Sequence, residues 1–139
     1  MRIVESVAQL RLPNKHEKFL NHFLRDLASL ACVTRVFLFG SLARGDGGKS
    51  SDLDLMILGN EFSEQDEMFI YTDCGPDFKS DYRVPCDLIN RTEDLFEEAL
   101  AYVGSLEWRV NHEGVDLTSI LRSNRDRRFR CCRCRADRF

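Results

Sequence analysis

The chain has 139 residues, of which 43% are hydrophobic and 31% charged, and it carries a formal net charge of -3. This composition is typical of one soluble globular domain, and no apolar run approaches the roughly 18 residues that a membrane span requires. Because the amino-terminal sequence lacks an uninterrupted apolar segment with a small-residue cleavage site, we expect a cytoplasmic protein without a secretory signal.

The first predicted element is a helix over residues 14–31. Its apolar residues follow helical spacing, and Asn14 with Glu17 three residues later resembles a capping box. Residues 33–39 are mostly β-branched or aromatic and end at Gly40, which predicts a strand followed by a tight turn.

A half-turn of helix through Ala43 and a Gly- and Ser-rich loop lead to the second predicted strand, residues 52–58. Its nearly continuous apolar character is typical of a strand covered on both faces. Ser63 is expected to begin a short helix, which a turn-rich segment follows. A third strand is predicted over residues 84–90, and Pro85 is tolerable there only at a strand beginning or on an edge.

Two further helices are predicted in the last third of the chain. Thr92 caps the first of them, which ends at Gly104, and the second spans residues 105–112. Residues 115–117 are expected to be extended. From Arg122 onward the chain has almost nothing to bury, so an unstructured segment is predicted.

The alternation of strands and helices predicts an α/β or α+β fold built around one sheet. We expect a single domain over residues 1–120, followed by an Arg- and Cys-rich tail over residues 121–139 that is disordered.

Charge is unevenly distributed between these two parts. Residues 120–139 carry eight Arg against two Asp, a net charge of +6, so about -9 remains on the rest of the chain. An acidic body argues against nucleic acid as the main partner, although a site for a divalent metal would also contribute carboxylates. The basic tail could itself contact RNA or an acidic partner.

The six cysteines do not have the spread spacing of a disulfide scaffold. Cys32 and Cys86 lie in or beside apolar runs, and three others crowd into "CCRC", so reduced thiols are expected. Cys131 and Cys134 form half of a zinc site, but no second pair follows them, and zinc is not predicted.

Two carboxylates one residue apart, Asp52 and Asp54, open the second strand. Residues i and i+2 of a strand project from the same face, so these carboxylates lie within a few ångström of each other and repel. Mg²⁺, which is commonly held by one or two carboxylates plus substrate phosphate oxygens, would supply the missing positive charge. Gly40 lets a phosphate approach the backbone, and Ser41 offers a hydroxyl and a backbone N–H.

The segment "GSLARGDGGKSSDLDLMIL" resembles the signature of the DNA polymerase β-like nucleotidyltransferase superfamily, in which Gly-Ser is followed after ten residues by Asp-x-Asp. Within that superfamily the short chain most resembles the minimal nucleotidyltransferases (MNT proteins), which are paired with HEPN proteins in prokaryotic toxin–antitoxin systems. The resemblance extends from about residue 14 to Leu117. It includes "VPCDLINRTEDLFEEAL", which matches the strand of the third carboxylate and makes Asp87 that acid.

The resemblance implies a palm-like mixed sheet flanked by helices and a metal-dependent transfer of a nucleoside monophosphate from an NTP, ATP above all, to a hydroxyl. It implies two Mg²⁺ ions held by Asp52, Asp54 and Asp87, and Asp87 would help to remove the proton of the acceptor hydroxyl. The remaining matched residues would bind the nucleotide and its phosphates: Gly40, Ser41 and Arg44.

The implied acceptor is a tyrosine of a partner HEPN toxin, which gives the chain an antitoxin role. An alternative is a non-catalytic, nucleotide-binding module that masks its partner. An aminoglycoside nucleotidyltransferase is a third reading, but its antibiotic pocket is usually completed by a second domain or subunit. The number of subunits is left open.

Simpler explanations compete with several of these roles. An acid-x-acid pair is often only a solvated strand end, and Asp77 and Asp81 lie near Asp87 in the sequence. Arg44 and Lys49 could be ordinary surface charges. The three histidines (His16, His22 and His112) have no ligand spacing and are expected at the surface or the core edge, whereas Trp108 is expected to pack in the core or on a partner.

Overall fold

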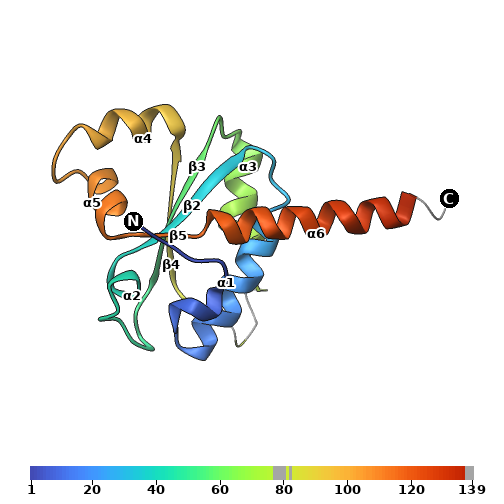
Figure 1. Ribbon diagram of the computed structural model, residues 1–139, viewed down its shortest axis with the longest axis horizontal. Coiled ribbons are helices and arrows are strands. Elements are labelled where there is room, and N and C mark those ends of the chain that lie inside the picture. Colours follow the sequence, from blue (N-terminus) through green and yellow to red (C-terminus); the bar gives the residue numbers. More distant parts are fainter. Residues whose placement is uncertain (77–80, 82, 137–139) are drawn as a thin grey trace.

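A five-stranded mixed sheet forms the centre of the molecule, in the order β1-β5-β2-β3-β4 (Figure 1). The structure is a computed structural model that describes residues 1–76, 81 and 83–136. It confirms the predicted sheet flanked by helices. The strands are β1 (Arg2–Ile3), β2 (Val33–Phe39), β3 (Leu53–Gly59), β4 (Cys86–Thr92) and β5 (Val115–Asp116).

The three long strands agree with the prediction to within two residues at their starts. β2 and β3 are antiparallel, and β3 and β4 are parallel, with Asp54 opposite both Phe39 and Asp87. The predicted third strand began at residue 84, but β4 begins after Pro85. Proline has no N–H to donate to the sheet, and its carbonyl accepts the N–H of Leu53 instead.

The two faces of the sheet bury different residues. Along β3, Leu53, Leu55 and Ile57 enter the larger core, whereas Met56 and Leu58 enter a smaller core on the opposite face. This alternation follows from the period of two in a strand. Asp54 therefore belongs to the face with the smaller core.

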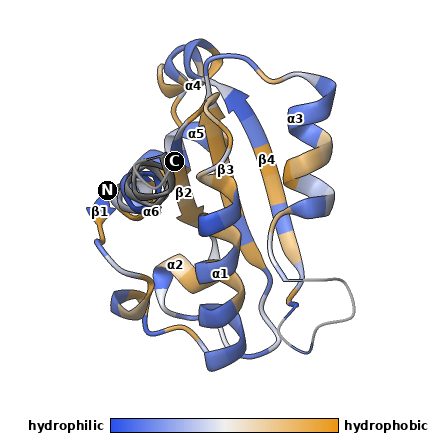
Figure 2. Ribbon diagram, turned by 90° about the vertical axis from the view of Figure 1, so that its right-hand side faces the viewer, coloured by the Kyte–Doolittle hydropathy of each residue, from blue (hydrophilic) through white to orange (hydrophobic). Residues whose placement is uncertain are grey.

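Helices cover both faces (Figure 1). Helices α1 and α6 pack on the larger core, and α4 and α5 pack on the smaller one. The strands between them are hydrophobic, whereas the helix surfaces are largely hydrophilic (Figure 2). Within the described residues, no helix is long and apolar enough to cross a bilayer. The helices are η1 (Val7–Leu10), α1 (Asn14–Leu27), α2 (Ser41–Arg44), α3 (Glu64–Met68), η2 (Phe69–Asp73), α4 (Glu93–Leu100), α5 (Leu106–Glu113) and α6 (Thr118–Ala136).

The ends of α1 differ from the prediction. Pro13 is the N-cap residue and no side chain caps the helix, so the expected capping box of Asn14 and Glu17 does not form. Asn14 is already inside the helix, where its side chain cannot act as the cap. At the other end the helix stops at Leu27, four residues before the predicted end.

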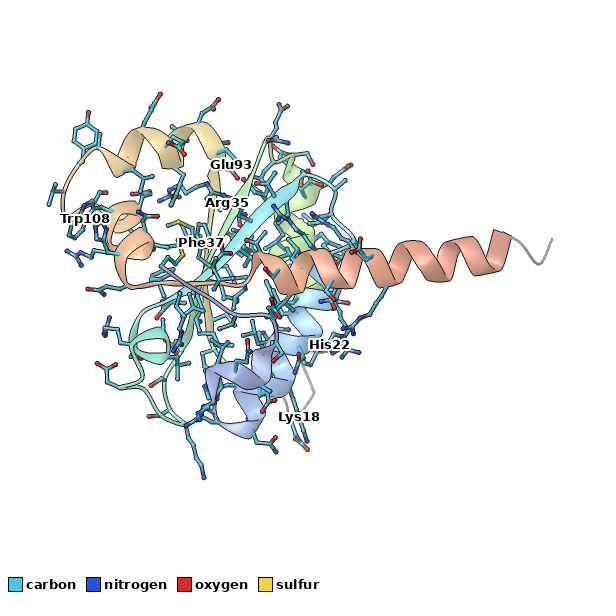
Figure 3. The ribbon with its side chains drawn as sticks, viewed as in Figure 1. Lys18, His22, Arg35, Phe37, Glu93 and Trp108 are labelled. Atoms are coloured by element: carbon cyan, nitrogen blue, oxygen red, sulfur yellow. The ribbon has the colours of Figure 1, made fainter. Side chains whose placement is uncertain are left out.

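Arg35 and Glu93 connect β2 to the start of α4. The Glu93 carboxylate accepts hydrogen bonds from Arg35 at 2.7 and 3.0 Å and from the Thr34 hydroxyl at 2.5 Å. The Arg35 guanidinium also lies over the rings of Phe37 and Phe96, and Figure 3 shows the labelled Arg35, Phe37 and Glu93 together. These contacts lower the pKa of Glu93, mainly through the hydrogen bonds from Arg35, and hold α4 on the sheet.

Helix α6 corrects the prediction that the chain is unstructured from Arg122. It runs from Thr118 to Ala136 and projects from the body (Figure 1). The Arg125 guanidinium donates hydrogen bonds to three backbone carbonyls, those of Ala28, Leu30 and Val33, at 2.6–3.2 Å. These carbonyls lie in the segment that follows α1 and at the start of β2, so Arg125 joins α6 to the body.

We expect Arg125→Gln to destabilise the protein by about 2–3 kcal/mol, because the backbone carbonyls that it serves lose charge-assisted hydrogen bonds. Urea denaturation measures this loss. Arg127→Gln removes the same charge from an exposed position of the same helix and should change the free energy of unfolding by less than about 0.5 kcal/mol. Equal effects of the two substitutions would show that the bonds of Arg125 contribute little.

Candidate functional site

The three predicted acids meet at one end of one sheet face. Asp54 is the second residue of β3, and Asp87 lies opposite it on the parallel strand β4. Asp52 lies just before the first residue of β3, and its charge acts on Asp54. Asp52 and Asp87 are exposed, and Asp54 is half-buried.

The pKa of Asp54 is raised above its ordinary value, and the causes describe the site. Burial is the largest cause, followed by the charge of Asp87 and a hydrogen bond between these two carboxyl groups. Asp52 raises the pKa further, whereas Arg44 lowers it. The negative charge of the cluster is therefore incompletely balanced by the protein itself.

The Gly-Ser turn lies directly against Asp54. Gly40 follows β2 with φ +77° and ψ -159°, a conformation that is essentially restricted to glycine. A Cβ atom at this position would overlap Oδ2 of Asp54. The two halves of the sequence motif, more than ten residues apart, thus come into contact because residue 40 has no side chain.

The segment after the turn folds back on α2. The backbone N–H groups of Gly45, Asp46 and Gly47 all donate to the Ser41 carbonyl, at 3.0–3.2 Å. A Cβ on Gly47 would lie 2.9 Å from the Ser41 Oγ, so the loop passes close to this hydroxyl. The small residues of the loop are consequently part of the shape of the site.

Arg44 extends from the end of α2 into this site. Its guanidinium lies 3.4 Å from the carboxylate of Asp46 and 3.7 Å from that of Glu113. The side chain is about half exposed, and its charge reaches Asp54. Arg44 therefore places a positive charge beside the acids. Lys49, by contrast, is an exposed residue of the loop.

His16 is a residue whose place the sequence analysis missed. It was expected at the surface or core edge, but it is only 2% exposed, and its Nε2 lies 2.7 Å from the Ser51 carbonyl. Because a carbonyl only accepts, Nε2 donates this bond and ties α1 to the residue before Asp52. The signal was available: His16 precedes Phe19 and Leu20 by three and four residues, on the apolar stripe of α1.

The other candidates do not join the acids. His22 pairs with Asp26 within α1 at 3.3 Å. Trp108 stacks on His112 with ring centroids 4.0 Å apart and is partly exposed, so of its two expected places, the core or a partner, the interior of the core is excluded. Asp81 is an exposed turn residue, and Asp77 lies outside the described residues.

Cys86 lies beside the acids and remains a thiol. Burial is the main cause that raises the pKa of its thiol to about 12, and the charges of Asp52, Asp54 and Asp87 contribute. The group is neutral at pH 7 and is no nucleophile there. The chemistry of the site is therefore that of its oxygen atoms.

The donor set fits a hard cation such as Mg²⁺. In the part of the chain that the structure describes, no group of three or more His, Cys, Asp or Glu side chains is placed so that it could hold a metal ion. Mg²⁺ is nevertheless bound through one or two carboxylates when substrate phosphates and water supply the other ligands. Asp52, Asp54 and Asp87 provide such carboxylates, and the raised pKa of Asp54 marks the uncompensated charge that a cation would balance.

Comparison with known proteins identifies a family for this chain. The family model described as "Nucleotidyltransferase domain" matches residues 17–110, a range that includes β2, β3, β4 and the turn at Gly40. One similar solved structure is a crystal structure from Sulfolobus solfataricus whose title calls the protein a "putative nucleotidyltransferase". The two sequences are 22% identical, the match covers 68% of this chain and 81% of the other chain, and the TM-score is 0.45. Comparison with curated proteins gave no match.

Proposed function

The chain belongs to the nucleotidyltransferase domain family, and from this premise we propose that it transfers AMP from ATP to a hydroxyl group of another molecule. The observation that carries the proposal is the contact between the Gly-Ser turn and Asp54, with Asp87 opposite Asp54 on the next strand. A phosphate-binding turn and a cluster of carboxylates are the two parts that such a transfer needs.

In the proposed reaction the acceptor oxygen attacks the α-phosphorus, an O–P bond forms, and the bond to the β-phosphate breaks with release of pyrophosphate. Asp87, exposed at the end of the sheet, accepts the proton of the hydroxyl. Asp52 and Asp54 would hold Mg²⁺, and with Asp87 the site would hold two ions. The metal would supply charge neutralisation at the attacking and leaving oxygens.

The turn and α2 bind the other end of the nucleotide in this proposal. The backbone at Gly40 allows a close approach, and the Ser41 hydroxyl donates to a β- or γ-phosphate oxygen. Arg44 contributes positive charge to the same phosphates. Positioning and charge compensation, rather than covalent chemistry, would account for the rate.

We further propose that the acceptor is a protein hydroxyl, such as a tyrosine of a HEPN toxin, and that the modification silences the toxin in the cytoplasm. The support is the resemblance of the Gly-Ser and Asp-x-Asp segments to minimal nucleotidyltransferases, together with the exposure of Asp52 and Asp87 to a large partner. A module that masks its partner without catalysis would have no need of three carboxylates at one site.

The experiment that tests the activity uses ATP labelled at the α-phosphate, Mg²⁺ and a lysate of the source cell. We expect label on a macromolecule with the wild-type chain, none with Asp54→Asn, and none when the label is on the γ-phosphate. The size of the labelled molecule identifies the acceptor. If all four NTPs give no label, transfer is refuted and the masking function becomes the hypothesis to test, by co-purification of a partner.

A further inference from the structure

The strand that carries Asp87 has one edge that no other strand of the described chain covers. β4 is the last strand in the sheet order, and it pairs only with β3 (Figure 2). The Pro85 carbonyl accepts the N–H of Leu53 of β3. Because the N–H and C=O of one strand residue point to the same side and the sides alternate along the strand, those of Cys86 and Leu88 point away from β3. They form the outer edge of the sheet on either side of Asp87.

Two of the groups at this edge lack a hydrogen-bond partner. The Leu88 carbonyl accepts a bond from the Tyr71 hydroxyl at 3.3 Å, as expected of a group that faces outward. In the part of the chain that the structure describes, no group bonds to the Leu88 N–H or to the Cys86 carbonyl. Unpaired N–H and C=O groups on a sheet edge are a template for one more strand. A donor and an acceptor that flank Asp87 are what one residue of a parallel strand needs.

An apolar cavity of about 470 Å³ adjoins the same stretch of β4, and its volume is within the range of ligand pockets. It lies on the face of the larger core, because Cys86 and Leu88 pack against that core. Helix α1, the η2 turn and β4 supply most of its apolar wall: Phe19, Phe23, Ile70, Tyr71, Cys86 and Leu88. The cavity therefore offers room for an apolar side chain next to the open edge.

Asp87 projects from the opposite face of β4. It is exposed, and it is the register partner of Asp54, which belongs to the face with the smaller core. Adjacent residues of a strand project to opposite faces. The cavity and the acid therefore lie on the two sides of one edge, and a chain that runs along this edge as a strand presents alternate side chains to both.

We propose that the molecule that accepts the nucleotide docks as an extended peptide strand, parallel to β4 at its open edge. One peptide residue lies opposite Asp87, where its N–H donates to the Cys86 carbonyl and its C=O accepts the Leu88 N–H. Its side chain bears the acceptor hydroxyl and stands beside Asp87, because neighbouring strands are about 4.8 Å apart. An apolar residue directly before or after it places its side chain in the cavity. This inference rests on the proposed function, in which Asp87 accepts the hydroxyl proton.

Docking is measured without ATP or Mg²⁺, so that the result does not depend on transfer. The probe is the peptide Thr-Leu-Tyr-Leu-Thr with blocked ends, titrated into the full-length protein while NMR follows the backbone amide signals. We expect a saturable shift at Leu88, whose N–H gains a partner, and little change at Met56 in the interior strand β3. Absence of a saturable shift at Leu88 would overturn the proposal. A shift that needs no peptide and follows protein concentration would also overturn it, because a second copy would then occupy the edge.

Two methylated peptides test the pairing itself. An N-methyl group on the Tyr removes the donor to the Cys86 carbonyl and is expected to weaken binding about fivefold. An N-methyl group on the following Leu adds the same atoms where the N–H points away from β4, so it should leave the affinity unchanged. Equal affinities of the two methylated peptides would contradict the proposed register.

The role of the cavity is tested by replacing both Leu residues of the peptide by Asn, which is similar in shape but polar. We expect binding about tenfold weaker, because an apolar side chain no longer leaves water for the cavity. An unchanged affinity would show that the cavity does not take part.

Leu88→Pro removes the donor on the protein side, and it breaks no bond between β3 and β4 because this N–H points away from β3. It should weaken peptide binding about fivefold. Tyr71→Phe is the control, since it removes a hydroxyl at the same edge but leaves the Leu88 N–H, and it should bind as the wild-type protein does. Urea denaturation checks that Leu88→Pro is folded. If it is not, the comparison of the two methylated peptides on the wild-type protein decides.

Failure of the docking and failure of the proposed activity are distinguishable. Peptide binding at Leu88 without label from any NTP would refute the transfer and leave the edge as a binding site for a strand. A labelled macromolecule in the lysate without peptide binding at Leu88 would leave the transfer standing and refute the docking. Label on the Tyr of the bound peptide, absent with Asp54→Asn, would support both.

Discussion

Replacing Asp54 by Asn is expected to lower nucleotidyl transfer on the order of 10³-fold, the size of effect seen when a charge-stabilising group is removed from a phosphoryl-transfer site. The same substitution should raise the melting temperature of the metal-free protein at pH 7, because one of three neighbouring negative charges is gone. Transfer with a labelled nucleotide and thermal unfolding in EDTA measure the two effects. Loss of activity thus coincides with a gain in stability.

The direction of the pKa shift of Asp54 determines how the stability of the wild-type protein changes with pH. The pKa of Asp54 is higher in the folded state than in the unfolded chain, where an Asp titrates near 3.9. The folded protein therefore binds this proton more strongly, and the wild-type protein loses stability as the pH rises from about 4 through the raised pKa. The stability of Asp54→Asn relative to the wild-type protein should therefore increase over that pH range.

Asp126→Asn is the matched control, since it makes the same chemical change at an exposed position of α6. It should alter neither activity nor the melting temperature. Full activity of Asp54→Asn would contradict the assignment of the acids, and a lower melting temperature in EDTA would contradict the electrostatic argument.

Gly40→Ala is expected to be the most damaging single-methyl change in the motif. The new Cβ would occupy the volume of the Asp54 carboxylate, and the backbone conformation at Gly40 costs a non-glycine residue about 1–3 kcal/mol. We expect destabilisation of that size in urea together with loss of transfer. The cause is steric, so shortening the facing side chain in Gly40→Ala/Asp54→Ala should restore part of the stability but none of the activity, whereas the isosteric Asp54→Asn should not relieve the overlap.

Gly48→Ala adds the same methyl group where nothing lies within 4 Å, in the loop that follows the same turn. It should retain both stability and transfer. If Gly40→Ala were as active as Gly48→Ala, the contact between the turn and the carboxylate would have no bearing on the reaction.

Much of the fold and the site could be predicted because the signals are local. The strands β2 and β3 have long apolar runs, and the Gly-Ser and Asp-x-Asp segments flank a short loop, so sequence spacing limits their distance in space. Asp87 is farther along the chain. It was predicted because its segment resembles the family's strand with the third carboxylate, and the register of β3 and β4 places it opposite Asp54.

The missed features depend on contacts between distant segments. Arg125 reaches carbonyls more than 90 residues away in the sequence, which a reading of the basic tail by composition cannot reveal. His16 joins Ser51 in the same way. The two residues of β1 are too few to show a period, and they form a strand only because β5 lies beside them.

Asp87 lies on β4, the last strand of the sheet order, and this position has a consequence for how the protein fails on heating. Outer strands generally open at a lower free energy than the centre of a sheet. An opening of β4 would separate Asp87 from Asp54 while β2, β3 and the Gly-Ser turn stayed folded. We therefore expect local opening of one strand to limit the chemistry of the site, with activity lost at a temperature below that of global unfolding.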